Sequence, residues 1–432
     1  MALHYEKIRP TNRVLAWIED RIPLLSFTAA HTTDYYAPKN LNVWYYFGVL
    51  AGVVLVNQLV TGIFLTMHYT PSAAGAFDSV EHIMRDVEWG WLIRYMHSTG
   101  ASLFFIVVYL HMFRGLLYGS YKKPRELVWI LGMLVYLVLM AEAFVGYVLP
   151  WGQMSFWGAK VIISLFGAIP VVGQGLTEWI MGDYLPGDAT LNRFFALHVI
   201  ALPLVLLLLV VLHVLALHEV GSNNPDGVEI EDTPGANGRP LDGIPFHPYY
   251  SFEDLLVTSV FLIIAAFVVF FAPTFGGWFL EHDNFVEANK LVTPEHIKPV
   301  WYFTPFYAML RVVPHKLLGV VTMFAAIGAL FLMPWLDRGK VKSIRYRGLG
   351  YKVALGMFAV AFVLLGAIGA GAATPAIAAV LGQGVNVAAV ENGLGRVLVA
   401  AYFGFFGFLW VYTAFGIERT RPVPTRVGSP HT

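Results

Sequence analysis

Two histidines in one apolar stretch are the residues of this sequence whose type and spacing point most directly to chemistry. His97 and His111 lie fourteen residues apart within an apolar run from about 91 to 118. In an α-helix this spacing separates the imidazoles by roughly 21 Å along the axis and leaves them within about 40° of each other. Two metal-binding side chains are therefore expected on one face of one helix, at two depths.

A second apolar run, beginning near residue 191, repeats the arrangement with His198 and His213. Two such helices side by side offer a histidine pair at each depth, which is the arrangement that binds two haems through paired imidazoles. A lone buried histidine is ordinarily a hydrogen-bonded core residue. Four ionisable side chains in membrane-spanning helices are too costly to be incidental, so the sequence predicts metal ligation.

The composition describes a polytopic membrane protein. Hydrophobic residues make up 57% of the chain and charged residues 13%, with a mean hydropathy of +0.63. No cysteine occurs, so iron–sulfur clusters, covalently attached haem and disulfides would have to belong to partner proteins. The pattern suggests no nucleic-acid partner. The first 41 residues lack the apolar run of a signal peptide, and we expect a helix lying at the membrane interface.

The predicted fold class is all-α, with eight transmembrane helices, an N-terminal four-helix bundle that binds two haems, and short surface helices. Apolar runs long enough to span a bilayer occur at 42–66, 92–118, 126–148, 191–217, 255–272, 315–335, 350–371 and 397–416. The predicted divisions are an interfacial segment (1–41), a haem-binding half (42–220), a cytoplasmic linker (221–250), a C-terminal half that completes a quinol pocket (251–417) and a tail (418–432). Most of the 28 Lys and Arg residues fall in loops on the side of the N-terminus, so both termini are expected in the cytoplasm.

Two segments between spans, 149–181 and 275–311, are too apolar and aromatic for ordinary loops. We expect short helices on the outer membrane face that form two walls of one pocket near His97 and His198. An aromatic belt at the membrane surface is the alternative explanation for part of this composition.

Glycines and arginines recur beside the histidine positions. The first and third spanning runs each carry two glycines fourteen residues apart, which would let a macrocycle edge approach the backbone: Gly48, Gly62, Gly132 and Gly146. Ordinary helix contacts also use glycine. Arg94 and Arg114 each lie three residues from a histidine on its membrane-surface side, where haem propionates would emerge. Snorkelling at a helix end is the alternative for either arginine.

The four histidines, the paired glycines, the run LPWGQMSFWG (149–158) and the run PVWY (299–302) together resemble cytochrome b of the ubiquinol:cytochrome c oxidoreductases, over residues 10–417. The resemblance implies a low-potential haem b on His97 and His198 and a high-potential haem b on His111 and His213. It also implies a Rieske iron–sulfur protein, a membrane-anchored c-type cytochrome and a second copy of the complex as partners. The turn at Ser222 is similar to the bacterial respiratory form, which is a multi-pass protein of the inner membrane.

The resemblance implies two quinone sites on opposite faces. Ubiquinol would be oxidised on the periplasmic face, with one electron passing to the Rieske protein and the other crossing through both haems to a quinone on the cytoplasmic side. The residues expected at the oxidation site are Phe144, Tyr147, Gly158, Tyr302 and Tyr307. The residues expected at the cytoplasmic site are His218, Asn223 and Asp254, with Glu253 where the family often has lysine.

Two departures from the family pattern affect these expectations. The interval from His198 to His213 is fifteen residues, which would rotate His213 by about 100° unless the helix is locally rewound, most cheaply near Pro203. Val300 replaces the acid that usually follows the proline of the second motif. We expect Glu295 to take over proton exit, with Asp283 as the alternative acid.

Two other functions remain open from the residues alone. One is a haem b membrane anchor of another quinone-linked dehydrogenase, although such anchors are usually smaller. The other is a transporter without redox chemistry, in which the intramembrane histidines relay protons or bind substrate.

Overall fold

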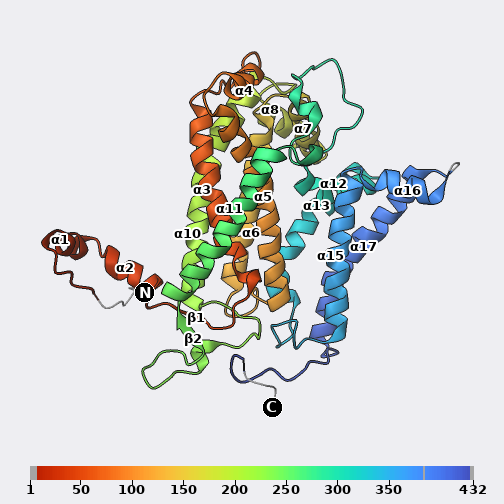
Figure 1. The fold of residues 1–432 in the computed structure, drawn as a ribbon. Coiled ribbons are helices and arrows are strands. Elements are labelled where there is room, and N and C mark those ends of the chain that lie inside the picture. The colour runs from red at the N-terminus through yellow and green to blue at the C-terminus, as the bar shows by residue number, and fades with distance from the viewer. Residues whose placement is uncertain (1–6, 383–384, 429–432) are drawn as a thin grey trace.

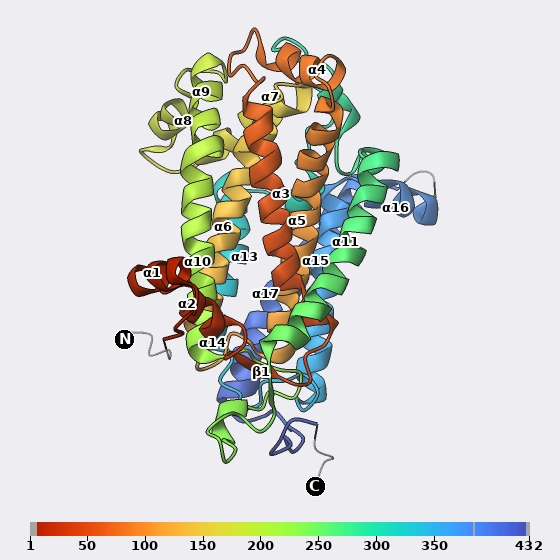
Figure 2. The same ribbon diagram turned by 60° about the vertical axis from the view of Figure 1, so that its left-hand side comes forward.

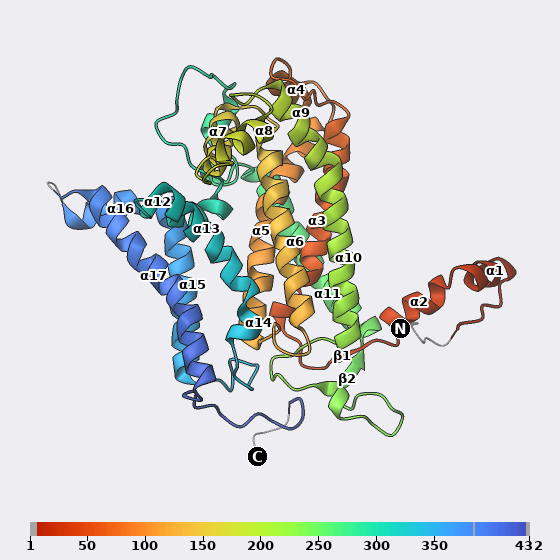
Figure 3. The same cartoon turned by 180° about the vertical axis from the view of Figure 1, so that it is seen from behind.

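The computed structural model describes residues 7–382 and 385–428. Five long helices stand side by side as one bundle (Figure 1): α3 (Phe47–Thr66), α5 (Gly90–Tyr118), α6 (Glu126–Val148), α10 (Leu202–Val220) and α11 (Ser251–Phe271). Helix α3 packs along α5, and α10 packs along α6. A second group lies beside α5 and α6 (Figure 3): α12 (Thr304–Val312), α13 (Lys316–Phe331), α15 (Leu349–Gly369) and α17 (Val387–Ala414).

Seven helical segments among the described residues are long and apolar enough to cross a membrane: Val43–Thr66, Gly90–Tyr118, Glu126–Val148, Asp188–Val220, Phe246–Phe271, Leu349–Gly369 and Val387–Ala414. The expected eighth run, 315–335, forms the shorter α13 and then α14 (Met333–Leu336). The helix breaks beside Pro334, whose nitrogen carries no hydrogen to donate. The last span begins at Val387, ten residues before the start that the apolar pattern predicted.

Short helices cover the end of the bundle that is uppermost in Figure 1, called here the upper end. They are α4 (Ala76–Arg85), α7 (Gln153–Phe166), α8 (Gly173–Met181) and α9 (Asp188–Ala196), with single turns η5 (Phe275–Gly277), η6 (His282–Phe285) and η7 (Trp301–Phe303). The two aromatic segments therefore form short helices and turns, and they meet at this end. Helix α16 (Ala373–Leu381) lies at the margin of the second group.

The opposite end, the lower end, carries the polar segments. Helices α1 (Arg13–Arg21) and α2 (Leu24–His31) stand away from the bundle in Figures 1 and 3, and Figure 2 shows them at the level of the lower part of α10. The apolar side chains of Val14, Leu15 and Trp17 are exposed. Turns η1 (Val43–Tyr45), η3 (Ile230–Asp232) and η4 (Phe246–Tyr250) complete this end. Residues 1–6 of the predicted interfacial segment and 429–432 of the predicted tail lie outside the described residues.

A two-stranded antiparallel sheet is a feature that the all-α prediction did not include. Strand β1 (Tyr36–Pro38) pairs with β2 (Gly243–Pro245), with Tyr36 opposite Pro245. The linker is rich in proline and glycine, which disfavour a helix, and strand pairing supplies partners for its backbone polar groups instead.

The fifteen-residue histidine interval is accommodated by a π-helical turn. Turn η2 (Leu197–Ala201) connects α9 to α10 and contains His198, and the amide of Leu202 donates to the carbonyl of Leu197 five residues earlier. A π-turn inserts one residue into an α-helix. The extra residue is therefore absorbed beside His198 and just before Pro203, close to where the sequence predicted rewinding.

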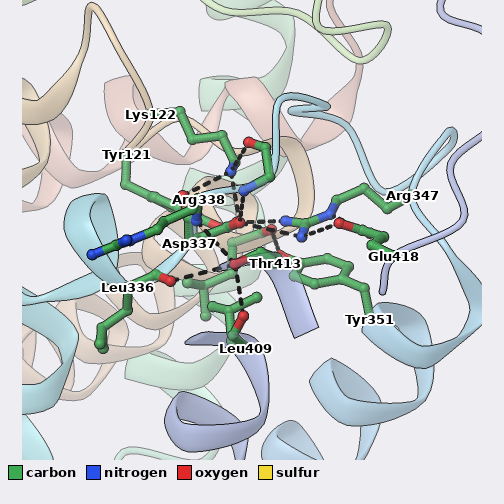
Figure 4. A network of polar contacts seen from close by, with 12 residues as sticks. Tyr121, Lys122, Leu336, Asp337, Arg338, Arg347, Tyr351, Leu409, Thr413 and Glu418 are labelled. Atoms are coloured by element: carbon green, nitrogen blue, oxygen red, sulfur yellow. Dashed lines mark hydrogen bonds and ion pairs between the residues drawn. The ribbon is translucent and has the colours of Figure 1, made fainter. Parts of the chain in front are cut away.

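A buried polar network joins the two helix groups at the lower end (Figure 4). The carboxylate of Asp337, after α14, accepts a hydrogen bond of 2.5 Å from the Tyr121 hydroxyl and lies 2.8 Å from Lys122 Nζ. Arg347 forms ion pairs with Asp337, at 2.5 Å, and with Glu418, at 2.8 Å. Tyr121 and Lys122 lie in the turn between α5 and α6, so this network ties the first bundle to the second group.

Candidate functional site

The structure brings the four histidines together as two pairs. The ring centroids of His97 and His198 are 6.1 Å apart with an interplanar angle of 88°, and those of His111 and His213 are 6.3 Å apart at 71°. Two imidazoles that bind one metal ion from opposite sides, with nitrogen about 2 Å from the metal, place their centroids roughly 6 Å apart. Both pairs therefore have the separation that a shared metal ion requires.

A glycine faces each of the four imidazoles. A Cβ built on Gly48 would lie 3.2 Å from Cε1 of His111, and one on Gly62 would lie 3.3 Å from Cε1 of His97. Built Cβ atoms on the other helix meet the other two rings: Gly132 at 3.1 Å from His213, and Gly146 in overlap with His198. The glycine repeat on α3 and α6 therefore leaves a narrow slot at each pair.

The Nδ1 atoms at the upper pair have acceptors. Thr61 Oγ1 donates to the Asn57 carbonyl at 2.6 Å and lies 2.9 Å from His97 Nδ1, which leaves the hydroxyl oxygen free to accept. His198 Nδ1 lies 3.1 Å from the backbone carbonyl of Glu142 and 3.0 Å from its carboxylate Oε1. Acceptors on Nδ1 assign the ring hydrogen to that atom and leave Nε2 as the free ligand nitrogen.

The lower pair lacks such acceptors. In the part of the chain that is described, Nδ1 of His111 and Nδ1 of His213 are buried and make no hydrogen bond. The Val128 carbonyl faces His213 without reaching hydrogen-bond geometry.

The surroundings of both pairs fit a haem. Each pair supplies two nitrogen ligands, each has glycine-lined clearance for a planar group, and each has an arginine nearby. Arg94 lines the same cavity as His97 and His198. Arg114 lies over the Tyr45 ring at 4.9 Å and donates to Ser120 at 3.0 Å, while its Nε is buried without a partner among the described residues. The two cationic heads belong to residues near opposite ends of α5, where they could pair with the propionates of a haem.

One cavity of about 230 Å³ extends from the upper histidine pair toward the upper end. Tyr147, Val300 and Tyr302 line it together with His97 and His198. A smaller cavity of about 20 Å³ shares Tyr147 and Val300 and is also lined by Phe144, Gly158 and Lys298. The larger cavity therefore contains the slot between His97 and His198 and continues past it toward Tyr147 and Tyr302.

The two aromatic segments form walls that are held to each other and to α5. The Gln153 amide donates to the Val286 carbonyl at 2.8 Å, and the Ser155 amide donates to Asn284 at 2.8 Å. Tyr302 stacks on Phe105 of α5 with centroids 3.9 Å apart. These contacts fix the cavity mouth against the bundle.

A buried acid, Glu281, lies behind Tyr147, which lines both cavities. Its side chain is 7% exposed and accepts a hydrogen bond from the Tyr147 hydroxyl. Burial raises the pKa of Glu281, and the Lys298 cation opposes that shift. A carboxyl group with a raised pKa beside a pocket is suited to exchange protons near neutral pH.

The acids expected from the sequence lie elsewhere. Glu295 and Asp283 are exposed, and neither lines the two cavities. Tyr307 also lines neither, and its hydroxyl donates to the Ile297 carbonyl at 3.2 Å. Of the residues expected at the oxidation site, the structure thus gathers Phe144, Tyr147, Gly158 and Tyr302 around the cavities.

The lower end holds the second set of expected residues. His218 is stacked between His31, at 4.9 Å, and Tyr35, at 4.6 Å. Asp254 is partly buried at the start of α11, and no hydrogen bond or ion pair joins it to His218 in the described ranges. Asn223 is buried and donates to the Tyr118 carbonyl at 2.6 Å and to Ser120 at 3.2 Å.

Sequence reasoning missed Glu142, Glu281 and Thr61. Glu142 carried a signal, because an acid in the middle of an apolar span is costly unless it has a function. Thr61 precedes a glycine that was singled out, but a hydroxyl in a helix usually bonds its own backbone. Glu281 stood in a polar stretch, EHDN, where nothing distinguished a buried acid from exposed ones.

Comparison with known proteins places the chain among its relatives. The family described as Cytochrome b/b6/petB matches residues 32–221, and the family described as Cytochrome b(C-terminal)/b6/petD matches residues 287–389. Cytochrome b of Allochromatium vinosum is 55% identical over 96% of this chain and 98% of its own length. Cytochrome b of Rhodospirillum rubrum is 47% identical over 99% of each chain. A chain of a solved structure, a hyperthermophilic respiratory Complex III, superposes with a TM-score of 0.82 at 35% identity, covering 93% of this chain and 99% of that one.

Proposed function

This chain belongs to the cytochrome b family, and from that membership we propose that it is the di-haem subunit of a bacterial ubiquinol:cytochrome c oxidoreductase. The coarser assignment, cytochrome b of a bc1-type Complex III, follows from the relatives. The di-haem proposal rests on two histidine pairs whose ring separation suits a shared metal ion, with a glycine facing each ring.

Haem b supplies a one-electron redox centre at each pair, so that an electron can cross the membrane between two depths. The side chains of this protein would bind and orient each haem and separate it from water. Acceptors on Nδ1 of His97 and His198 hold those rings with Nε2 free. Arg94 and Arg114 would neutralise propionates, and the glycines keep side chains out of both slots.

Ubiquinol is proposed to bind near Tyr147 and Tyr302, in the part of the upper cavity that lies beyond the slot of the histidine pair and would face the periplasm. One electron goes to a Rieske iron–sulfur partner and the other crosses the membrane. Oxidation releases two protons. We assign one acceptor to Glu281, because Tyr147 links this buried acid to the cavity while Val300 cannot titrate.

Glu295, the acid favoured by the sequence, remains the second candidate for proton exit. Its exposure suits a later relay to water better than contact with quinol, since a residue that takes the proton directly must reach the ring. Asp283 is exposed in the same way and is the third candidate.

Quinone reduction is proposed at the lower end, which would face the cytoplasm, where both termini are expected. His218 and Asp254 supply titratable groups that can deliver protons to a reduced quinone, and Asn223 and Glu253 lie nearby in the chain. A membrane-anchored c-type cytochrome and a second copy of the complex are the other proposed partners.

The test is spectroscopic and enzymatic. The purified complex should show a reduced-minus-oxidised spectrum with two b-type components of different midpoint potential, and it should reduce cytochrome c with ubiquinol. A transporter without redox chemistry would show no haem spectrum. A haem anchor of another dehydrogenase would show haem but would not reduce cytochrome c from quinol. Either result would overturn the proposal.

A further inference from the structure

The two histidine levels are built from one fourteen-residue repeat, and they differ at one position of α6. Gly146 faces His198 and Gly132 faces His213. Four residues before Gly146 stands Glu142, and four residues before Gly132 stands Val128. The two positions are equivalent in the repeat, yet one offers a carboxylate and the other an apolar side chain.

The carboxylate is directed at the ligand ring. Glu142 Oε1 lies 3.0 Å from His198 Nδ1, and Oε2 is buried with no hydrogen-bond partner in the described chain. The side chains of His198 and Glu142 are 18% and 15% exposed. A cation that pairs with Glu142 is not found among the ion pairs of the described residues, so the His198 ring is the polar group that this carboxylate contacts.

At the lower level the equivalent contact is missing. Val128 has no side-chain acceptor, and His213 Nδ1 makes no hydrogen bond among the described residues. The same contrast occurs on α3, where Thr61 faces His97 but Phe47, fourteen residues earlier, cannot accept from His111. The two levels therefore differ in the side chains that face the rings, and also in the backbone hydrogen bond that His198 makes and His213 does not.

We propose that Glu142 is a positioning residue that lowers the midpoint potential of the haem held by His97 and His198. The hydrogen bond of His198 Nδ1 goes to the backbone carbonyl of Glu142 at 3.1 Å, and the carboxylate adds a negative charge 3.0 Å from the same nitrogen. A negative charge beside an imidazole that holds haem iron would strengthen the imidazole as a donor and favour the oxidised iron, so a lower potential follows. This inference rests on the proposed function for the presence of haem at this pair, and it adds a residue that contributes to the difference between the two haems.

The experiment measures both midpoint potentials by redox titration of the purified complex. Glu142→Gln keeps an acceptor oxygen and removes the charge, and Glu142→Val reproduces the lower level. In each variant the potential of the haem on His97 and His198 should rise, by about 59 mV for a tenfold change in the ratio of reduced to oxidised haem. The shift in Glu142→Val should equal or exceed that in Glu142→Gln. The haem on His111 and His213 is the internal control and should keep its potential.

The reciprocal variant tests the same contact at the other level. Val128→Glu should lower the potential of the haem on His111 and His213 and leave the other unchanged. If Glu142→Val loses a haem, Glu142→Thr gives a hydroxyl acceptor like that of Thr61 and should still raise the potential. Electron paramagnetic resonance of the oxidised haems reports whether both histidine ligands are retained. If both haems are present and their potentials are unchanged in Glu142→Gln and in Glu142→Val or Glu142→Thr, the inference is overturned. If the wild-type complex contains no haem, the proposed function is overturned instead.

Discussion

Replacing Asp337 with asparagine should weaken the contact between the two helix groups by about 3 to 5 kcal/mol, the cost of leaving a buried charge without its partner. The Asp337 carboxylate is fully buried, and Lys122 is 7% exposed. Arg347 would retain Glu418 as a partner at 2.8 Å. Lys122 would retain hydrogen bonds to the carbonyls of Asp337 and Gly339, at 3.2 and 2.7 Å, but no counter-ion. One uncompensated cation therefore remains.

The expected change in melting temperature follows from the length of the chain. Unfolding entropy grows with residue number, so 3 to 5 kcal/mol corresponds to a fall of about 3 to 6 °C for a chain of this size. The measurement is the midpoint of thermal unfolding of the detergent-solubilised complex at fixed scan rate, followed by loss of the haem spectrum.

Two control variants separate this cause from a general effect of mutation. Lys122→Met combined with Asp337→Asn removes the unpaired cation and should recover part of the lost stability. Asp242→Asn also removes a buried carboxylate, but its partners Lys39 and Arg426 are 43% and 44% exposed and would return to water, so the midpoint should change little. The reasoning would be refuted if the Lys122→Met/Asp337→Asn double variant were no more stable than Asp337→Asn. It would also be refuted if Asp242→Asn lowered the unfolding midpoint as much as Asp337→Asn does.

The Asp337 carboxylate should also make the stability of the protein depend on pH in the acid range. Burial favours the neutral acid, but the Lys122 and Arg347 cations outweigh it and hold the pKa of Asp337 below its usual value. The stability that this carboxylate contributes is therefore present above the unfolded pKa of about 3.9 and is lost as the pH falls through the lower folded pKa. The asparagine variant should lack this part of the acid dependence.

Three other predictions, with their control variants, address the proposed redox sites. His213→Leu should remove one b-type component from the difference spectrum and spare the other; if both survive, His218 replaces His213 as the candidate ligand. Asp254→Asn should slow reoxidation of the lower haem several-fold without slowing its reduction, measured by stopped-flow spectroscopy, and an unchanged rate would remove Asp254 from the site. Glu281→Gln should lower quinol oxidation about tenfold or more, as loss of a general base does. Because the pKa of Glu281 is raised, wild-type turnover should decline with falling pH at a higher pH than an ordinary glutamate would give, and Glu281→Gln should lack that limb. Glu295→Gln is the matched control, and Val300→Glu in the Glu281→Gln background should restore turnover; a loss confined to Glu295→Gln would return the role to that residue.

Much of the fold and the pairing of the histidines could be predicted because both depend on helix periodicity. A fourteen-residue interval means nearly four whole turns whatever the rest of the chain does, so His97 and His111 share a face by local geometry alone. Membrane spans follow in the same way from the length of apolar runs. The run 315–335 is the exception among the predicted spans. Its apolar pattern is continuous, but the helix breaks beside Pro334.

The acid that we propose for proton exchange could not be predicted, because its burial depends on how a loop without periodicity folds. Glu281, Asp283 and Glu295 lie within fifteen residues in polar surroundings, and only the docking of the loop on 153–155 determines which of them is buried. Proximity to Val300 in the sequence favoured Glu295. In the folded chain Glu281 is linked through Tyr147 to the cavity that Val300 lines.

Glu281 and Glu142 are less constrained in position than the repeat of glycines and histidines. The glycines and histidines occupy a helical repeat that cannot shift by one residue without losing a slot, and where the interval does lengthen, a π-turn beside His198 restores the alignment. Acids are less constrained, since a carboxylate needs only to reach a ring nitrogen or a tyrosine hydroxyl. Glu142 does so from one helical turn away from Gly146, and Glu281 does so from a loop. We therefore expect single side chains to change the proposed haem potential and proton transfer while the spacing of the two histidine pairs stays fixed.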